Sequence, residues 1–461
     1  MAFLFKPVPI ASLVFFRIVF GILGFSDVLS TWIYYHLMSD AYNPDKFRFK
    51  YYGFEWAEPL GGQWIMSAFF FVLCVLGLLV AIGKWYRLSA TLFAFGFTYT
   101  YLLEKAHYLN HGYLFCWICF LMIFLPAHRQ FSADVWKKPA LRQDHIPFWC
   151  LFLLPFLMGV VYFYGGIAKI NPDWLQAVPL KQWLDQRAGL PVIGKLLVKD
   201  QTAYFMAYGG LLLDLTAAFL LSFRKTRLFV FAAIIFFHLS NLLVFSIGIF
   251  PMLSLSLSAL YFAPDFPLKI WNRLTIRFPS WKRINSWWEK KTAIPEPAIP
   301  MWQARTNWQP FIAVGVGLLM AVHLLIPLRH HLFPGDVTWT EEGHRYSWRM
   351  MLRHKSGHGH FMVVDKASGE ATKVRPIKYL DSSKQLRKIF THPDMILQFA
   401  HYLHDIYQAE GKDVAVYAEV DARLNYGIES PYIDPEVDLT QVKWAFFKTS
   451  PWILPEKMEV E

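Results

Sequence analysis

The sequence is poor in cysteine and in charge, and both shortages narrow the class of protein. Only four of its 461 residues are cysteines, and all four lie inside apolar segments, so no extracellular disulfide framework is predicted. Charged residues make up 17% of the chain, against 55% hydrophobic and 18% aromatic residues. A chain this apolar is not an ordinary soluble protein. Its composition is typical of a polytopic membrane protein that carries a polar appendage.

Internal repeats, low-complexity tracts and a signal-peptide cleavage site are also missing. No small-residue cleavage site follows the first apolar run, so we interpret that run as a retained membrane span. Paired half-length repeats with glycine or proline breaks, which transporters often have, are not found. The net charge of +11 does not indicate a nucleic-acid partner, because the basic residues lie in loops between apolar runs, where they would meet anionic headgroups.

Nine apolar runs predict a predominantly α-helical, polytopic membrane bundle with 8-9 spans. They cover residues 8–28, 64–83, 88–103, 113–126, 147–168, 203–223, 228–248, 250–262 and 310–328. The two shortest, 113–126 and 250–262, also suit re-entrant or buried helices.

Counted as nine crossings, the runs place the connecting loops alternately on two faces. One face collects more of the basic residues, including segments 129–142 and 269–305, and the positive-inside rule makes it cytoplasmic. Lys169, the 104–112 loop and everything after Arg329 then share the extracytoplasmic side. We expect an integral protein of a bacterial inner membrane, or of an ER-type membrane if the host is eukaryotic.

A change of composition after residue 328 marks a second domain. We expect residues 1–328 to form the membrane domain, with a basic, tryptophan-rich interfacial linker at 269–307, and residues 329–461 to form a small extramembrane α+β domain. Strands are predicted at 346–353, 360–365, 370–374 and 413–425, with a hairpin turn at 365–369. Residues 383–408 predict one or two amphipathic helices, broken near Pro393.

A single amine follows a long uncharged run. Residues 148–168 carry no charged side chain and end in a Gly165–Gly166 pair shortly before Lys169. About 20 apolar residues cross a bilayer as a helix, so we expect Lys169 near the boundary between hydrocarbon and water. There it could extend its charge to the headgroups, as membrane-edge lysines usually do. Held in a partly dry place, it could instead act as a neutral general base.

Other polar groups lie in or beside the apolar runs. We interpret Arg17, Asp27 and Asp214 as mutual partners that hold helices together, with a functional role as the alternative. His238 and Asn241 stand three residues apart on one helix face and predict a polar cavity.

Histidines outside the spans have two different interpretations. In the 104–111 loop, a histidine could donate a hydrogen bond to a developing anion, with an ordinary surface role as the alternative. In the tail, His354, His358 and His360 lie in a glycine-containing stretch with no acidic or cysteine ligand beside them, so no metal site is predicted.

Five blocks of sequence, in order along nearly the whole chain, carry a resemblance to a known family. They are FRIVFG at 16–21, LLEKAHYLNHGYL at 102–114, VYFYGGIAKINPDW at 161–174, GGLLLDL with FHLSNLLVFSIGIF at 209–215 and 237–250, and YSWRMM at 346–351. A later DPEVD at 434–438, followed by Trp444, also fits. With these blocks the chain resembles a bacterial-type relative of the vitamin K-dependent gamma-glutamyl carboxylases, with an HTTM-like membrane domain.

The resemblance implies a reaction. Members of the family oxidise vitamin K hydroquinone with O2 to the epoxide. The strongly basic alkoxide formed on the way removes a γ proton from a peptide glutamate, and the carbanion takes up CO2. The expected enzyme is therefore a carboxylase, a carbon–carbon lyase, coupled to epoxidation. Its implied partners are the bilayer, an isoprenoid quinone and a glutamate-containing peptide, with O2 and CO2 as co-substrates and no metal.

The resemblance also implies residue roles. Lys169 falls where the family has its active-site lysine, and His111 falls where a group stabilises the oxygenated intermediate. Cofactor-pocket roles are implied for Asn110 and Tyr162, and we assign His238 and Asn241 to the same pocket. Substrate-side candidates are Trp348, Met350, Met351, Arg353 and Lys355, and either of the last two could pair with the glutamate carboxylate.

Three departures from the animal enzymes leave alternatives open. The animal enzymes have two adjacent lysines where this chain has Ala168–Lys169, and a histidine where it has Arg353. The sequence also ends soon after the DPEVD block, which puts propeptide-guided carboxylation in doubt. One alternative is a hydroquinone epoxidase without carboxylase activity, and another, of a different class, is a membrane transporter.

Overall fold

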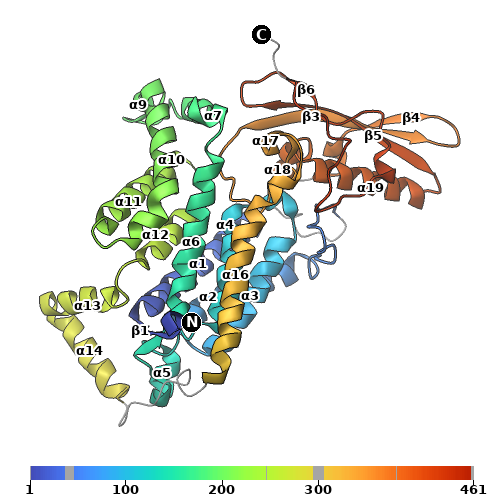
Figure 1. Ribbon diagram of the computed structural model, residues 1–461. Coiled ribbons are helices and arrows are strands. Elements are labelled where there is room, and N and C mark those ends of the chain that lie inside the picture. Colours follow the sequence, from blue (N-terminus) through green and yellow to red (C-terminus); the bar gives the residue numbers. More distant parts are fainter. Residues whose placement is uncertain (1, 37–45, 246, 294–305, 381, 458–461) are drawn as a thin grey trace.

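A computed structural model of the chain describes residues 2–36, 46–245, 247–293, 306–380 and 382–457 (Figure 1). All nine predicted apolar runs form helices. They are α1 Ala11–His36, α2 Gln63–Ile82, α3 Tyr86–Leu102, α4 Asn110–Phe124, α6 Trp149–Ala168, α10 Asp200–Ser222, α11 Arg227–Val244, α12 Phe250–Ala259 and α16 Gln309–Leu325. Five of these helices (α1, α2, α6, α10, and α16 with its continuation to Leu332) are long and apolar enough to cross a membrane. The predicted fold class, a mainly α-helical membrane bundle, is confirmed.

Hydrogen bonds between the connections show that α2, α3 and α4 run in alternating directions. At one end of the bundle, the Asp134 N–H donates to the Gly83 carbonyl at 3.0 Å, which joins the α2–α3 turn to the segment after α4. At the other end, the Lys105 N–H donates to the Phe49 carbonyl at 2.8 Å, which joins the α3–α4 connection to the segment before α2. The directions of α2, α3 and α4 therefore alternate as the sequence predicts, and the number of membrane crossings stays a prediction.

Arg17 stabilises the first of these two ends. Its buried guanidinium donates to the backbone carbonyls of Ala81, Ala127, Gln130 and Phe131. Asp214 lies elsewhere and pairs with Lys169. The prediction that Arg17, Asp27 and Asp214 are mutual partners is therefore wrong, because unpaired backbone carbonyls at the helix ends are themselves acceptors for a buried guanidinium.

Helix α6 is the most buried of the five long helices and packs closely against α10. The Gly165–Gly166 pair permits this approach, because a Cβ atom on Gly166 would lie 2.8 Å from the Leu215 backbone nitrogen. The close packing brings Asp214 on α10 to the carboxyl end of α6, where Lys169 follows.

Helices α11 and α12 do not form one continuous span. Helix α11 ends at Val244, and α12 begins at Phe250 and is only 10 residues long. At 1.5 Å per residue, α12 covers about half of a bilayer's hydrocarbon thickness. The break leaves room beside the carboxyl end of α6, and this room forms part of the cavity described below.

A four-stranded antiparallel sheet of order β4-β3-β5-β6 forms the core of the C-terminal part. The strands are β3 Lys355–Asp365, β4 Ala371–Val374, β5 Val414–Leu424 and β6 Ser430–Pro431, and they pack with α18 Ser383–Ile389 and α19 Pro393–Ala409. Phe49 and Ala106, from two connections of the helical bundle, are buried in the same hydrophobic core. The two parts of the chain therefore share a packed interface.

The strands predicted at 360–365, 370–374 and 413–425 are confirmed, as are the two helices and their break at Pro393. The strand predicted at 346–353 is wrong. Tyr346, Trp348 and Met351 have positive φ angles of 69°, 58° and 50°, which belong to the left-handed region and not to an extended strand. An irregular loop results, and the Tyr346 N–H is held by the Tyr108 hydroxyl at 2.8 Å.

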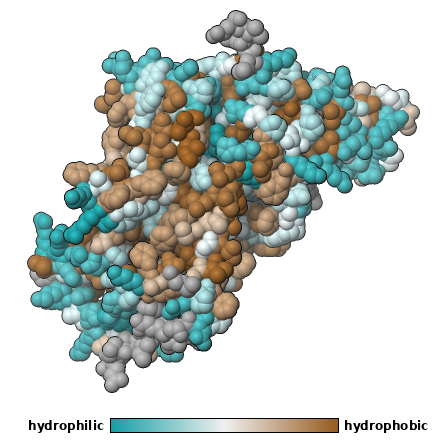
Figure 2. All heavy atoms as spheres, in the orientation of Figure 1, coloured by the Kyte–Doolittle hydropathy of each residue, from teal (hydrophilic) through white to brown (hydrophobic). Residues whose placement is uncertain are grey.

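Shorter elements complete the chain. They include β1 Pro7–Pro9, α5 Ala133–Lys137, β2 His145–Pro147, α7 Pro172–Leu175, α8 Val178–Asp185, α9 Gly194–Leu197, α13 Phe266–Arg277, α14 Pro279–Lys291 and α17 Val337–Thr340. In Figure 1, α13 and α14 lie at the opposite end of the bundle from the sheet. Figure 2 shows an apolar zone over the helices between hydrophilic regions at the two ends. Residues 294–305 of the predicted linker lie outside the described residues.

Candidate active site

A cavity of about 330 Å³ lies where the helical bundle meets the C-terminal part. Its bundle side is lined from α4, α6, α10 and α11, and its other side by residues 344–345 and 349–353 and by α18. Aromatic side chains form much of the wall, namely Trp174, Trp183, Phe237, Phe245 and Phe250. A cavity of this size with apolar walls and a few converging polar groups is typical of a small-molecule site.

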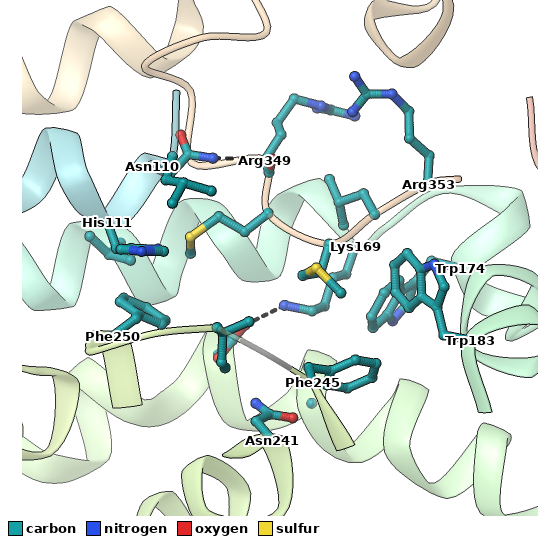
Figure 3. Close-up of a pocket in the computed structure, with 18 of the residues that line it drawn as sticks. Asn110, His111, Lys169, Trp174, Trp183, Asn241, Phe245, Phe250, Arg349 and Arg353 are labelled. Atoms are coloured by element: carbon teal, nitrogen blue, oxygen red, sulfur yellow. Dashed lines mark hydrogen bonds and ion pairs between the residues drawn. The ribbon is translucent and has the colours of Figure 1, made fainter. Parts of the chain in front are cut away.

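Lys169 caps the carboxyl end of α6 and faces into this cavity (Figure 3). Its side chain is buried, and its ammonium group hydrogen-bonds and ion-pairs with the Asp214 carboxylate. The same nitrogen lies 5.3 Å from the centre of the Trp174 ring. Lys169 therefore does not extend toward the headgroups, and the alternative of a buried, reactive amine fits its position.

Asn110 and His111 form the first turn of α4 on another side of the cavity. The Asn110 amide accepts from the Tyr108 hydroxyl at 2.9 Å and donates to the Arg349 carbonyl at 3.4 Å. The His111 ring stacks against Phe250 with centroids 5.6 Å apart. The loop before α4 and the loop carrying Arg349 thus hold this pair from both parts of the chain.

Tyr162 and His238 form a buried polar pair in the wall. The Tyr162 hydroxyl lies 3.0 Å from His238 Nε2 and 3.2 Å from the Ser258 hydroxyl. His238 Nδ1 is buried and has no hydrogen-bond partner among the residues that the structure describes. Asn241, one turn further along α11, lines the same cavity, so the predicted polar cavity on this helix face is present.

The loop after α17 covers the cavity on the C-terminal side. Met350, Met351, Leu352 and Arg353 line it, together with Arg349. Arg353 is already paired, because its guanidinium contacts the Glu341 carboxylate and lies 2.7 Å from His344 Nε2. The sulfur-containing side chains and the guanidinium groups therefore face the aromatic and amine groups of the bundle across one space.

Two family models match the chain, one on each side of this interface. The HTTM domain matches residues 5–266, and the vitamin K-dependent gamma-carboxylase, lumenal domain, matches residues 308–459. The chain belongs to the vitamin K-dependent gamma-carboxylase family. Comparison with solved structures gives no match. Family membership and the apolar helices identify an integral membrane protein of gamma-carboxylase-like function.

Membership in this family implies use of vitamin K hydroquinone and a glutamate-containing substrate. The cavity fits a naphthoquinone ring, because its walls are largely aromatic and its polar groups are spaced around them. A quinone oxygen would give the buried His238 Nδ1 the hydrogen-bond partner that it lacks among the described residues. Lys169 would offer the quinone a second polar contact.

Two of the predicted substrate residues do not line the cavity. Trp348 is buried in the hydrophobic core and packs on Tyr113 with ring centroids 5.5 Å apart. Lys355 hydrogen-bonds the Trp339 carbonyl and lies 3.8 Å from the centre of the Tyr432 ring. Both support the loop from outside the cavity. The position of Trp348 could not be predicted, because residues 346–353 form a loop with left-handed residues and not the expected strand.

The cavity also contains charged residues that the sequence analysis missed. The cations among them are Arg345, Arg349 and Lys388. The anion is Asp214, which forms an ion pair with Lys169. A signal for Asp214 was present, since an acidic residue inside an apolar run needs a partner. Lys388 carried no signal, because its helix shows only an ordinary amphipathic pattern.

Two of the three tail histidines pair singly with acidic residues, and the third, His354, lies 3.4 Å from the Gln182 amide. His358 Nδ1 lies 2.8 Å from Glu429, and His360 Nε2 lies 3.2 Å from Glu419. Within the described ranges, no three His, Cys, Asp or Glu side chains are grouped so as to hold a metal ion.

Proposed function

We propose that the protein is a gamma-glutamyl carboxylase that couples vitamin K hydroquinone epoxidation to carboxylation of peptide glutamate. One observation carries the proposal: Lys169 and His111, from helices of the bundle, share a single cavity with Met350, Met351 and the arginines of the C-terminal loop. A quinone site and a glutamate site that must exchange a reactive group need such a common space. No ordinary side chain is basic enough to remove a γ proton of glutamate, and the bound hydroquinone supplies that base.

The Lys169–Asp214 pair is the proton acceptor for the hydroquinone. Lys169 faces the cavity, and its nitrogen contacts the buried Asp214 carboxylate and, at 3.4 Å, the Gly165 carbonyl, of which only the carboxylate can take up a proton. A proton taken up by the Lys169 nitrogen can therefore leave across one hydrogen bond to Asp214. We assign the base to the pair, because the lysine alone would have to release its proton into an apolar wall.

His111 and Asn110 stabilise negative charge that develops on oxygen. They sit at the first turn of α4, where backbone N–H groups at a helix N-terminus also favour an anion. Tyr162 and His238 would hold the ring through their hydroxyl and ring N–H groups. The rings of His111 and His238 both pack on Phe250, so these groups reach the cavity close to one another.

The C-terminal part contributes the glutamate side of the site. Met350 and Met351 offer a flexible apolar contact for the methylene groups of the glutamate, and the arginines beside them offer donors for its carboxylate. Because Arg353 already pairs with Glu341, we assign it to positioning the loop. Burial between the two parts of the chain excludes water, which would otherwise protonate the carbanion before CO2 adds.

A single assay of the purified protein tests the proposal. Reduced vitamin K, O2, labelled bicarbonate and a glutamate peptide are supplied, and epoxide and fixed label are followed separately. We expect both products, with label fixed only when epoxide forms. Epoxide without label, even at high peptide concentration, would instead establish a hydroquinone epoxidase. If the folded protein makes neither product, the enzyme assignment is wrong and the membrane-transporter alternative is favoured.

A further inference from the structure

Five cationic side chains line the cavity, and three of them are neutralised by a carboxylate. The three pairs are Lys169–Asp214, Arg345–Asp394 and Arg353–Glu341. Arg349 and Lys388 have no carboxylate within 4.0 Å among the residues that the structure describes. The cavity therefore holds two cations in excess of its carboxylates.

The carboxylates on the C-terminal side cannot neutralise this excess, because other cations share them. Asp394 also contacts Lys105 at 2.6 Å, and Glu341 lies 3.9 Å from Lys355. His344 and His392 line the cavity as well. Burial and the neighbouring cations keep the pKa of both histidines well below the ordinary range, so at neutral pH they add donors and acceptors but no charge.

Arg349 and Lys388 are each held in surroundings that disfavour their charge. Burial lowers the pKa of Arg349 despite attraction from Asp336, and its buried Nε has no hydrogen-bond partner in the described part of the chain. Its side chain extends to the same edge of the cavity as that of Arg353 (Figure 3). Burial and the charges of Arg345 and Lys384 lower the pKa of Lys388 to about 8. A bound anion would relieve both residues.

We propose that Arg349 and Lys388 form a subsite for a 1,3-dicarboxylate, the chemistry of a γ-carboxyglutamate side chain. The inference rests on the proposed function and assigns its product. The two residues come from different elements, the loop after α17 and the helix α18, and both line the cavity. A monocarboxylate has one carboxylate for the two cations, whereas a malonate-like group carries one for each.

Two cations in this subsite, one for each carboxylate, would also assist carbon–carbon bond formation. In that step the carbanion at the glutamate γ carbon attacks the carbon of CO2. A new C–C bond forms, one C–O π bond breaks, and its electron pair remains on oxygen as a second carboxylate. No proton or oxidant enters the step. A cation already in place beside that oxygen stabilises the charge as it develops.

Malonate is the probe, with acetate as its singly charged counterpart. Calorimetry on the full-length protein measures the binding of each anion directly. We expect malonate to bind more tightly than acetate and to compete with the glutamate peptide in label fixation. The substitutions Arg349→Gln and Lys388→Met should each weaken malonate binding about ten- to a hundredfold.

Two further variants control for folding and for nonspecific charge. Arg387 is an exposed cation next to Lys388 on α18, so Arg387→Gln should leave malonate binding unchanged. Lys388→Arg keeps the charge and should retain most of the binding. Malonate that binds no better than acetate, or equally well to Lys388→Met and wild type, would overturn the subsite. Because binding is measured without turnover, this result is distinct from a wild-type protein that fixes no label.

Discussion

At the residue scale, the contact of Lys169 with Asp214 ties the proposed catalytic base to a partner on another helix. We expect Asp214→Asn to lower the epoxidation rate by roughly 10²- to 10⁴-fold, because the amide still accepts a hydrogen bond but cannot take up a proton. Asp214→Glu should restore part of the rate. The test compares the initial rates of epoxide formation of the variants and wild type. Thermal unfolding shows whether each variant is folded. An Asp214→Asn protein with wild-type rates would reduce Asp214 to a packing role.

Much of the site was predictable at this scale, but the pairing of charges was not. Lys169, His111, Asn110, Tyr162, His238, Asn241, Met350, Met351 and Arg353 all line one cavity, as the motifs indicated. Their roles remain predictions. Trp348 and Lys355 lie outside it, and the partner of Lys169 came from a run interpreted as structural. Motifs identify side chains, whereas pairing depends on how helices rotate against each other.

At the scale of elements, Gly166 sets the distance between α6 and α10. A Cβ atom there would lie 2.8 Å from the Leu215 backbone nitrogen, so the helices must separate. We expect Gly166→Ala to lower the free energy of unfolding by about 1–3 kcal/mol and to slow epoxidation. Gly209 on α10 is the matched control, since a Cβ atom there would meet nothing within 4 Å. Thermal unfolding and epoxidation are measured for both variants, and equal behaviour of the two would contradict the role of this close contact.

Glu104 makes the contact between the bundle and α18 sensitive to pH. Its carboxylate accepts from the Ala106 N–H and from Gln385 of α18, both at 2.8 Å, and burial raises its pKa from 4.5 to about 7. A raised carboxyl pKa means that the folded state holds the proton more tightly than the unfolded state. Its contribution to stability therefore falls as pH rises from about 4.5 to about 7, by roughly 3 kcal/mol in total.

Glu104→Gln tests this pH dependence. We expect the variant to gain stability relative to wild type above pH 7 and to lose the decline between pH 5 and pH 7. Thermal unfolding across that range measures the effect. Glu370→Gln, at an exposed position beside β4, should reproduce the wild-type profile. Identical profiles for Glu104→Gln and wild type would rule out Glu104 as the titrating group.

Element by element, the helices were more predictable than the loops. An apolar run longer than a turn has one way to satisfy its backbone in a membrane, so nine runs became nine helices. Residues 346–353 failed as a strand because Tyr346, Trp348 and Met351 adopt left-handed conformations. The loop is stabilised by contacts with residues distant in sequence, such as Tyr108. Local secondary-structure propensity cannot predict such contacts.

At the scale of the whole molecule, the positive-inside rule predicts which side of the membrane the site faces. Lys138 and Lys373 lie at opposite ends of the molecule, near α5 and on β4 respectively, and both are exposed. The four native cysteines are buried and give little background. In sealed membrane vesicles of known orientation, we expect a cysteine at Lys138 to label from the cytoplasmic side and one at Lys373 only from the other. Labelling of both from one side would contradict nine crossings.

The central claim is that a buried amine at the end of α6 starts chemistry in a cavity shared by both parts of the molecule. Epoxide formation by Lys169→Ala tests it most directly, with Lys195→Ala, an exposed lysine on α9, as the control. We expect Lys169→Ala to remain folded and to make no epoxide, with partial recovery when a small external amine is added, and Lys195→Ala to match wild type. Near-wild-type epoxidation by Lys169→Ala would contradict the account.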